Sequence, residues 1–150
     1  MHGERKLNAP ARKDRKIKTS IPDCGRLGLA LNGFESKVAA EEGFEGEKSN
    51  AQLHLHPDAR AVYASNRGPD SIAMFSIDPR SGVLTSLGQQ PAQKVPRAFG
   101  IDDDGDFLIS GADKSTILTS FRIDANGALK LVEEYDIGTT CAWVVPVKTR

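Results

Sequence analysis

The stretch that decides the fold of this chain is Asp58-Ala-Arg-Ala-Val-Tyr-Ala-Ser-Asn66, because it recurs as Asp104-Gly-Asp-Phe-Leu-Ile-Ser-Gly-Ala112. The next stretch recurs in the same way, since Ser71-Ile-Ala-Met-Phe-Ser-Ile-Asp78 returns as Ile117-Leu-Thr-Ser-Phe-Arg-Ile-Asp124. The two copies lie 46 residues apart, as the pair Phe75 and Phe121 shows. A period in the forties filled by short apolar runs is typical of stacked β-units, none of which can bury its apolar face alone.

Each repeat contains four short runs with the composition and alternation of β-strands, separated by turn sequences rich in Pro, Gly, Asp and Asn. The predicted strands are 52–55, 61–65, 71–77 and 83–87 in the first unit, and 98–101, 107–110, 117–123 and 129–133 in the second. A ninth apolar run, 142–145, aligns with the opening strand of a third unit. We therefore expect an all-β fold of β-propeller blades: about two four-stranded antiparallel blades plus the first strand of a third, preceded by an irregular N-terminal segment.

Residues 1–48 show no sustained apolar period, unlike the rest of the chain. We therefore expect two regions, an irregular or disordered segment at 1–48 and a partial propeller at 49–150. A basic run between Arg5 and Lys18 contains only one acidic residue, Asp14. This run is compatible with an arm for nucleic acid or a membrane surface, with an ordinary solvated tail, or with an unrelated leader. No aromatic residue interleaves the charges, which favours the last two interpretations.

Composition narrows the class of protein further. Lys and Arg together number 20, as do Asp and Glu, so the overall charge indicates neither a nucleic-acid nor a membrane partner. The two cysteines, Cys24 and Cys141, show no zinc-type spacing, and we expect reduced thiols in a cytoplasmic protein. No run of about 18 apolar residues and no signal-peptide pattern is present.

Several motifs together resemble a known family. His54-Leu-His-Pro-Asp-Ala-Arg-Ala-Val-Tyr-Ala-Ser-Asn-Arg-Gly68 is followed by Asp70-Ser-Ile-Ala-Met-Phe75, then by Val95-Pro-Arg-Ala-Phe-Gly-Ile-Asp102 and Ala142-Trp-Val-Val145. In order and spacing they resemble the lactonase-type seven-bladed β-propeller family, whose best-known member is the propeller form of 6-phosphogluconolactonase. The resemblance covers roughly residues 49–146, the C-terminal portion of the family domain, and we expect no family match in residues 1–48.

The resemblance implies hydrolysis of a sugar lactone ester, 6-phosphogluconolactone, to 6-phosphogluconate in the oxidative pentose phosphate pathway. In such a reaction water attacks the acyl carbon, so cationic donors must stabilise a tetrahedral oxyanion while a base takes the proton of water. A phosphorylated substrate also needs an anion clamp, for which the arginine fork is well suited. The implied chemistry requires no cofactor and no metal.

Four residues are expected to point toward one mouth of the central channel. Arg67 lies in the loop between the second and third strands, and Arg97 enters the inner strand of the second unit, while Gln52 and His54 lie on the inner strand of the first. We interpret Arg67, His54 and Gln52 as catalytic candidates, and Arg97 together with Arg67 as substrate-binding candidates. The alternatives are a loop arginine paired with Asp70 and an inner-strand histidine bonded to the backbone.

One of these positions and one neighbouring residue depart from the family resemblance. Gln52 stands where the family commonly has an acidic residue, and glutamine cannot act as a general base. Ala98 follows Pro-Arg where related sequences often have histidine. The sequence leaves open whether these departures alter the chemistry or leave it unchanged.

Other conspicuous residues are expected to be structural. We predict that His56 lies on the surface in a turn, that Trp143 packs in a core, and that Cys141 is inert. The acidic run Asp102-Asp-Asp-Gly-Asp106 lacks the ligand spacing of a calcium-binding EF-hand loop and corresponds in the repeat to a turn between strands.

The number of units poses the main functional question. Seven blades of this period need about 320 residues. We expect one of three situations: a truncated or split lactonase, a binding or assembly module completed by a chain that supplies the missing blades or by self-association, or an inactive remnant.

Overall fold

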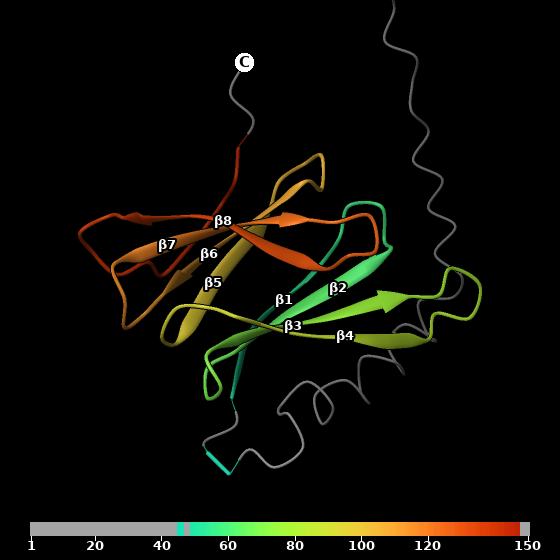
Figure 1. Cartoon of the computed structure of the whole chain (residues 1–150), viewed down its shortest axis with the longest axis horizontal. Coiled ribbons are helices and arrows are strands. Elements are labelled where there is room, and N and C mark those ends of the chain that lie inside the picture. Colours follow the sequence, from blue (N-terminus) through green and yellow to red (C-terminus); the bar gives the residue numbers. More distant parts are fainter. Residues whose placement is uncertain (1–44, 47–48, 148–150) are drawn as a thin grey trace, which may run out of the picture.

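The computed structural model describes residues 45–46 and 49–147 of the chain, and within them every regular element is a β-strand (Figure 1). The strands are β1 (Asn50–Leu55), β2 (Ala61–Asn66), β3 (Ser71–Ile77), β4 (Leu84–Pro91), β5 (Pro96–Ile101), β6 (Phe107–Ala112), β7 (Ile117–Ile123) and β8 (Leu129–Asp136). All eight predicted strands of the two units are therefore confirmed. The predicted segment 1–48 lies almost wholly outside the described residues, so its irregular character and the boundary at residue 49 stay predictions.

The strands form two four-stranded antiparallel sheets, ordered β1-β2-β3-β4 and β5-β6-β7-β8. Each sheet is a meander in which consecutive strands are neighbours, which confirms the expected blade topology. Figure 1 shows the sheets stacked beside each other, with β5 of the second blade next to β1 and β2 of the first. We call the sheets blade 1 and blade 2, and β1 and β5 their inner strands.

Aspartate side chains build the sharp turns that separate the strands. The Asp78 carboxylate accepts hydrogen bonds from the backbone N–H groups of Arg80 and Ser81, 3.0 and 2.7 Å away. The Asp102 carboxylate accepts hydrogen bonds from the N–H groups of Asp106 and Phe107, at 2.8 and 2.9 Å. Such Asx contacts fold the chain back on itself. The interpretation of the acidic run at 102–106 as a turn is thus confirmed.

The main hydrophobic core lies between the two blades. Residues of β2 and β3 in blade 1 pack against residues of β5 to β8 in blade 2; the buried members are Ala61, Tyr63, Ile72, Met74, Phe99, Leu108, Phe121, Ile123 and Leu129. Successive side chains of a strand point to opposite faces of its sheet, so on each strand only every second residue can enter this core. The 46-residue repeat therefore supplies the apolar faces that close the interface.

Two expectations for the C-terminal part are wrong. Residues 142–145 form no strand, and Trp143 is 72% exposed instead of packed in a core. A strand requires a hydrogen-bonded neighbour, and within the described residues this segment instead lies across the face of blade 2. There a side chain added at Gly111 would meet Cys141, and one added at Gly100 would meet Pro146.

Candidate active site

Gln52 is held in a distortion of the inner strand β1. The register between β1 and β2 shifts between Asn50 and Leu53, so two residues of β1 oppose the single residue Ser65 of β2. The Gln52 N–H donates to the Ser65 hydroxyl at 3.1 Å, and its side-chain Oε1 accepts a hydrogen bond from the Phe99 N–H at 2.9 Å. Bulges of this kind re-aim side chains near functional sites. Here the side chain crosses from blade 1 to blade 2.

His54 is half buried and lies against the same residue of β5. The ring centroids of His54 and Phe99 are 4.7 Å apart, with the planes tilted by 57°. Burial lowers the pKa of His54 from its ordinary value of 6.5, because the charged imidazolium loses solvation. The imidazole is therefore neutral at neutral pH and able to accept a proton.

Arg67 lies in the β2–β3 loop with a guanidinium group that has no anionic partner among the described residues. Its backbone N–H donates to the Ser49 carbonyl at 2.8 Å, which holds the β2–β3 loop at the start of β1. Within the described part of the chain its guanidinium forms no ion pair, and the alternative of pairing with Asp70 is not observed. The Nε atom is buried and has no hydrogen-bond partner among the residues that the structure describes. A buried donor without an acceptor carries a free-energy cost, and the Arg60 Nε is left in the same state.

Arg97 already has an anionic partner. Its Nη1 lies 3.1 Å from Oδ2 of Asp113, and both side chains are partly exposed. Exposed pairs of this kind contribute little stability and are easily exchanged. Asp113 occupies the same repeat position as Arg67, 46 residues later, so the equivalent loop of blade 2 carries the opposite charge.

Asp70 joins the regions that carry the two arginines. Its side-chain Oδ1 accepts a hydrogen bond from the Val95 N–H at 2.7 Å, and its carbonyl accepts one from the Ala92 N–H at 2.9 Å. The loop that contains Arg67 is thereby tied to the segment that leads into Arg97. The structure thus brings Gln52 and His54 together at Phe99, and places the Arg67 loop and Arg97, the second residue of β5, at the blade ends where β1 and β5 begin.

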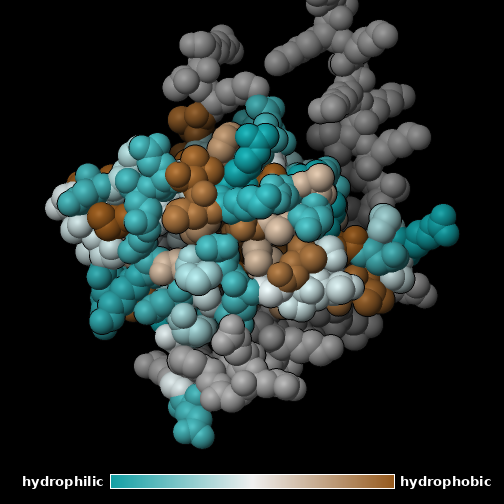
Figure 2. Space-filling view, in the orientation of Figure 1, coloured by the Kyte–Doolittle hydropathy of each residue, from teal (hydrophilic) through white to brown (hydrophobic). Residues whose placement is uncertain are grey.

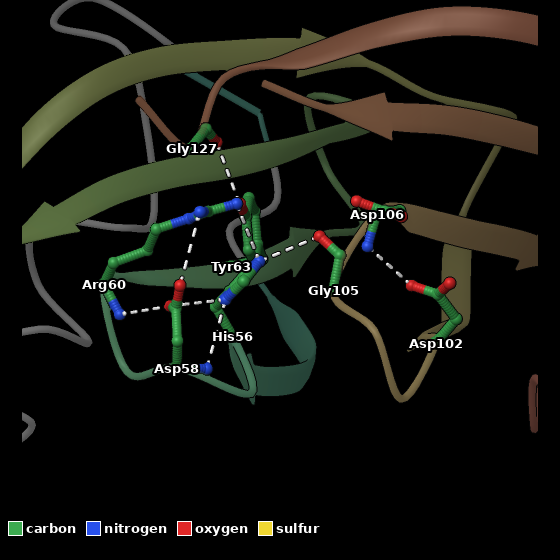
Figure 3. A network of polar contacts seen from close by, with 8 residues as sticks. All are labelled: His56, Asp58, Arg60, Tyr63, Asp102, Gly105, Asp106 and Gly127. Carbon is green, nitrogen blue, oxygen red and sulfur yellow. Dashed lines mark hydrogen bonds and ion pairs between the residues drawn. The ribbon is translucent and has the colours of Figure 1, made fainter. Parts of the chain in front are cut away.

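His56 was expected on the surface, and this prediction is wrong. The side chain is 3% exposed and sits in a polar network between the blades (Figure 3). Nδ1 lies 2.6 Å from Oδ1 of Asp58, and Nε2 lies 2.9 Å from the Gly105 carbonyl oxygen in the β5–β6 turn. The Arg60 guanidinium lies 3.1 Å from Nε2. The partners come from a turn 49 residues later, which no local pattern around His56 indicates.

Tyr63 adds a second contact in the same network (Figure 3). Its hydroxyl donates to the Gly127 carbonyl in the β7–β8 turn at 2.9 Å. Burial raises the pKa of Tyr63 to about 12, an effect that the nearby Arg60 partly opposes. Turns of blade 2 are thus docked onto blade 1 through polar groups as well as through the core.

The described residues hold neither a metal-binding cluster nor a bilayer-spanning helix. No group of three or more His, Cys, Asp or Glu side chains there could hold a metal ion. No helix in that part of the chain is long and apolar enough to span a bilayer.

Comparison with known proteins identifies the family. The model of the family described as "Lactonase, 7-bladed beta-propeller" matches residues 25–146. The chain belongs to this family. The match begins ahead of the expected boundary at residue 49 and so includes part of the 1–48 segment.

Curated relatives of this lactonase-family chain include bacterial enzymes named 6-phosphogluconolactonase. The chain is 34% identical to that of Erwinia tasmaniensis over 119 residues, which are 79% of this chain and 36% of the relative. It is 35% identical to that of Pectobacterium carotovorum over 115 residues, 76% of this chain and 35% of the relative. The chain thus spans about a third of the length of the curated relatives that it matches.

A solved structure gives the same family relationship. The periplasmic gluconolactonase of Pseudomonas aeruginosa superposes with a TM-score of 0.62 at 30% identity, covering 67% of this chain and 29% of that protein. The resemblance to lactonase propellers and the expected fold class are therefore confirmed. The roles of Gln52, His54, Arg67 and Arg97 stay predictions.

Proposed function

We propose that this chain contributes two blades to a lactonase that hydrolyses 6-phosphogluconolactone to 6-phosphogluconate. Similarity to curated 6-phosphogluconolactonases supports the substrate class. The observation that carries the proposal is the Arg67 guanidinium, which forms no ion pair with any described residue and lies in a loop held at the start of β1. The product would enter the oxidative pentose phosphate pathway.

The proposed chemistry assigns Arg67 to the developing negative charge. Water adds to the lactone carbonyl carbon, and the carbonyl oxygen becomes an oxyanion as the tetrahedral intermediate forms. The Arg67 guanidinium donates to this oxyanion. Collapse of the intermediate breaks the ring C–O bond and releases the open-chain hydroxy acid. Arg97 would bind the substrate phosphate after exchanging its exposed Asp113 partner.

His54 is the proposed proton acceptor. Its lowered pKa keeps the imidazole neutral at neutral pH, so the ring can take the proton from the attacking water and return it to the leaving alkoxide. Gln52 has no titratable proton, and we assign the base to His54 alone. The ring contact with Phe99 would hold the imidazole in one orientation.

The test is an assay of 6-phosphogluconolactone hydrolysis by the purified chain, alone and mixed with the N-terminal two thirds of the Erwinia tasmaniensis relative. We expect hydrolysis above the spontaneous rate, and a loss of at least about tenfold in Arg67→Ala. Arg80→Ala is the matched control, because Arg80 is an exposed arginine in the β3–β4 turn. The spontaneous rate in both preparations, or equal rates in the two variants, would contradict the proposal.

A second candidate function, assembly with further blades, is favoured by the outer face of blade 2, which we define as Phe107, Ile109 and Leu118. Cross-strand pairing of Phe107 with Arg122 and of Ile109 with Ser120 places these side chains opposite the buried Phe121. Their repeat counterparts Ala61, Tyr63 and Ile72 are buried against blade 2. We propose that this face, beside the part at Gly100 and Gly111 that residues 141–146 already cover, docks a further blade, from another chain or a second copy.

We also propose that the reaction takes place in the cytoplasm, where the sugar phosphate would be formed and used. One solved neighbour is named as periplasmic, so the location has to be measured. Fractionation of cells that express the untagged chain, with marker enzymes for each compartment, would decide between the two compartments.

A further inference from the structure

The inner strands β1 and β5 lie side by side but belong to separate sheets, so no ladder of backbone hydrogen bonds joins them. Phe99, near the middle of β5, is 1% exposed. Its N–H points out of its own sheet and is satisfied by the side-chain oxygen of Gln52, 2.9 Å away. A buried backbone N–H without a partner would cost about 1–3 kcal/mol. One glutamine side chain therefore replaces the missing ladder at this point.

The local structure of β1 aims Gln52 at β5. The register shift places residues 51–52 opposite Ser65 alone, and the Ser65 hydroxyl accepts the hydrogen bond of the Gln52 N–H. The backbone of Gln52 is thereby fixed by one blade while its side chain binds the other. The Phe99 N–H also fixes the orientation of the Gln52 side-chain amide. In the flipped orientation the amide NH2 group, itself a donor, would lie opposite the Phe99 N–H.

We infer that Gln52 is a positioning residue, which sets the separation of the inner strands through the Phe99 N–H and so holds His54 against the Phe99 ring. His54 lies two residues beyond Gln52 on β1, and its ring packs in a tilted contact against the Phe99 ring, while Arg97 lies two residues before Phe99 on β5. Loss of the Gln52 bond would let the two strands separate and move both candidate side chains. The consequence for catalysis rests on the proposed function, but the contact itself does not.

The contact can be tested without any activity. Gln52→Met removes the acceptor at nearly constant volume, whereas Gln52→Glu keeps an acceptor oxygen. Gln90→Met is the matched control, because the side chain of Gln90 bonds only locally, to the Pro91 carbonyl. The readout is the hydrogen-exchange rate of the Phe99 amide, measured by NMR on the full chain. We expect exchange about threefold to tenfold faster in Gln52→Met, the factor that one neutral hydrogen bond supplies, and no change in the other two variants.

Two results would overturn the positioning role. Unchanged Phe99 exchange in Gln52→Met would show that the bond does not hold the strand. Equal acceleration in Gln52→Met and Gln52→Glu would show that the acceptor oxygen is not what matters.

The lactonase assay adds a separate arm. For a positioning residue, kcat falls in Gln52→Met and is restored to within about threefold by Gln52→Glu. A lower kcat in Gln52→Met with normal Phe99 exchange would show a direct role on substrate and overturn the inference. If the unaltered chain has no activity, the proposed function fails, and the exchange rates alone decide the role of Gln52.

Discussion

Gly105 must be a glycine for two independent reasons. Its backbone φ is +74°, a left-handed conformation that L-residues with a side chain adopt only with strain. A Cβ at this position would also lie 2.5 Å from Cε1 and Nε2 of His56, the ring whose Nε2 contacts the Gly105 carbonyl. Backbone conformation and inter-blade packing thus meet in a single residue. Gly82, with φ of +71° and no atom within 4 Å of its would-be Cβ, has only the first constraint.

We therefore expect Gly105→Ala to lower the free energy of unfolding more than Gly82→Ala. The backbone strain common to both should cost about 1–2 kcal/mol. Displacement of the His56 ring should add about 1–3 kcal/mol in Gly105→Ala alone. Urea denaturation of the two variants measures the difference. Equal losses would mean that the His56 contact does not constrain this position.

His54 predicts a pH dependence of stability with a definite sign. Burial lowers the pKa of its imidazole in the folded chain, whereas the unfolded chain keeps the ordinary value of 6.5. The unfolded state therefore binds more protons as the pH falls below 6.5, and the folded state loses stability until the folded pKa is reached. Above 6.5 this contribution is fully present.

Urea midpoints between pH 7.5 and 5 should thus fall more in the unaltered chain than in His54→Gln, which cannot titrate. In the lactonase assay the same protonation should remove activity below the folded pKa. A parallel pH dependence of the two proteins would contradict the assigned shift.

At the scale of elements, turns of blade 2 dock onto blade 1 through hydrogen bonds (Figure 3). The Tyr63 hydroxyl reaches the Gly127 carbonyl from the middle of β2, in a buried environment. Tyr63→Phe would leave that carbonyl buried and unpaired, so we expect a loss of about 1–3 kcal/mol in the free energy of unfolding. Tyr135→Phe is the control, because the Tyr135 hydroxyl bonds the Glu133 carboxylate on the exposed part of β8. It should change stability by less than about 0.5 kcal/mol. Similar losses in both variants would refute a special role for the inter-blade bond.

The sequence predicts the elements because their signals are local. Alternation and Asx turns lie within each strand and loop, and β3 and β7 match their predicted ranges. Strand ends are less local: β4 continues to Pro91 and β8 to Asp136 because a neighbouring strand is there to pair with. Pairing between strands supplies hydrogen bonds that composition alone does not indicate.

The candidate site is predicted less completely for the same reason. The placement of Gln52 and His54 on the inner strand follows from the repeat, but their common contact with Phe99 depends on how the blades stack. Burial of His56 depends on a turn in the other blade. The ion pair between Arg97 and Asp113 is not predicted either, although alignment of the repeats sets Asp113 against Arg67 and shows the change of charge.

At the scale of the whole molecule, the two blades leave apolar side chains exposed on their surface. Hydrophobic residues (brown in Figure 2) interrupt the hydrophilic surface where β8 lies, and Leu131 and Val132 of β8 are both more than half exposed. The outer face of blade 2 continues the pattern that is buried between the two blades. Since repeat units are stabilised by their neighbours, this face is the natural place for another blade to dock.

Docking on the outer face of blade 2 predicts that the chain associates in solution and that a charge on this face prevents association. Phe107 is 36% exposed there, and Phe107→Glu places a carboxylate where an apolar blade face would dock, which carries a large desolvation cost. Val83→Glu is the matched control, because Val83 is an apolar residue, 58% exposed, outside that face and just before β4 of blade 1. Size-exclusion chromatography with light scattering at matched concentrations should give a mass above 16.2 kDa for the unaltered chain and for Val83→Glu, and a mass near 16.2 kDa for Phe107→Glu.

A monomeric unaltered chain would argue against self-association and leave a separate blade-supplying chain as the partner. Association unchanged by Phe107→Glu would place the contact on another surface, with the exposed side of β8 as the next one to alter.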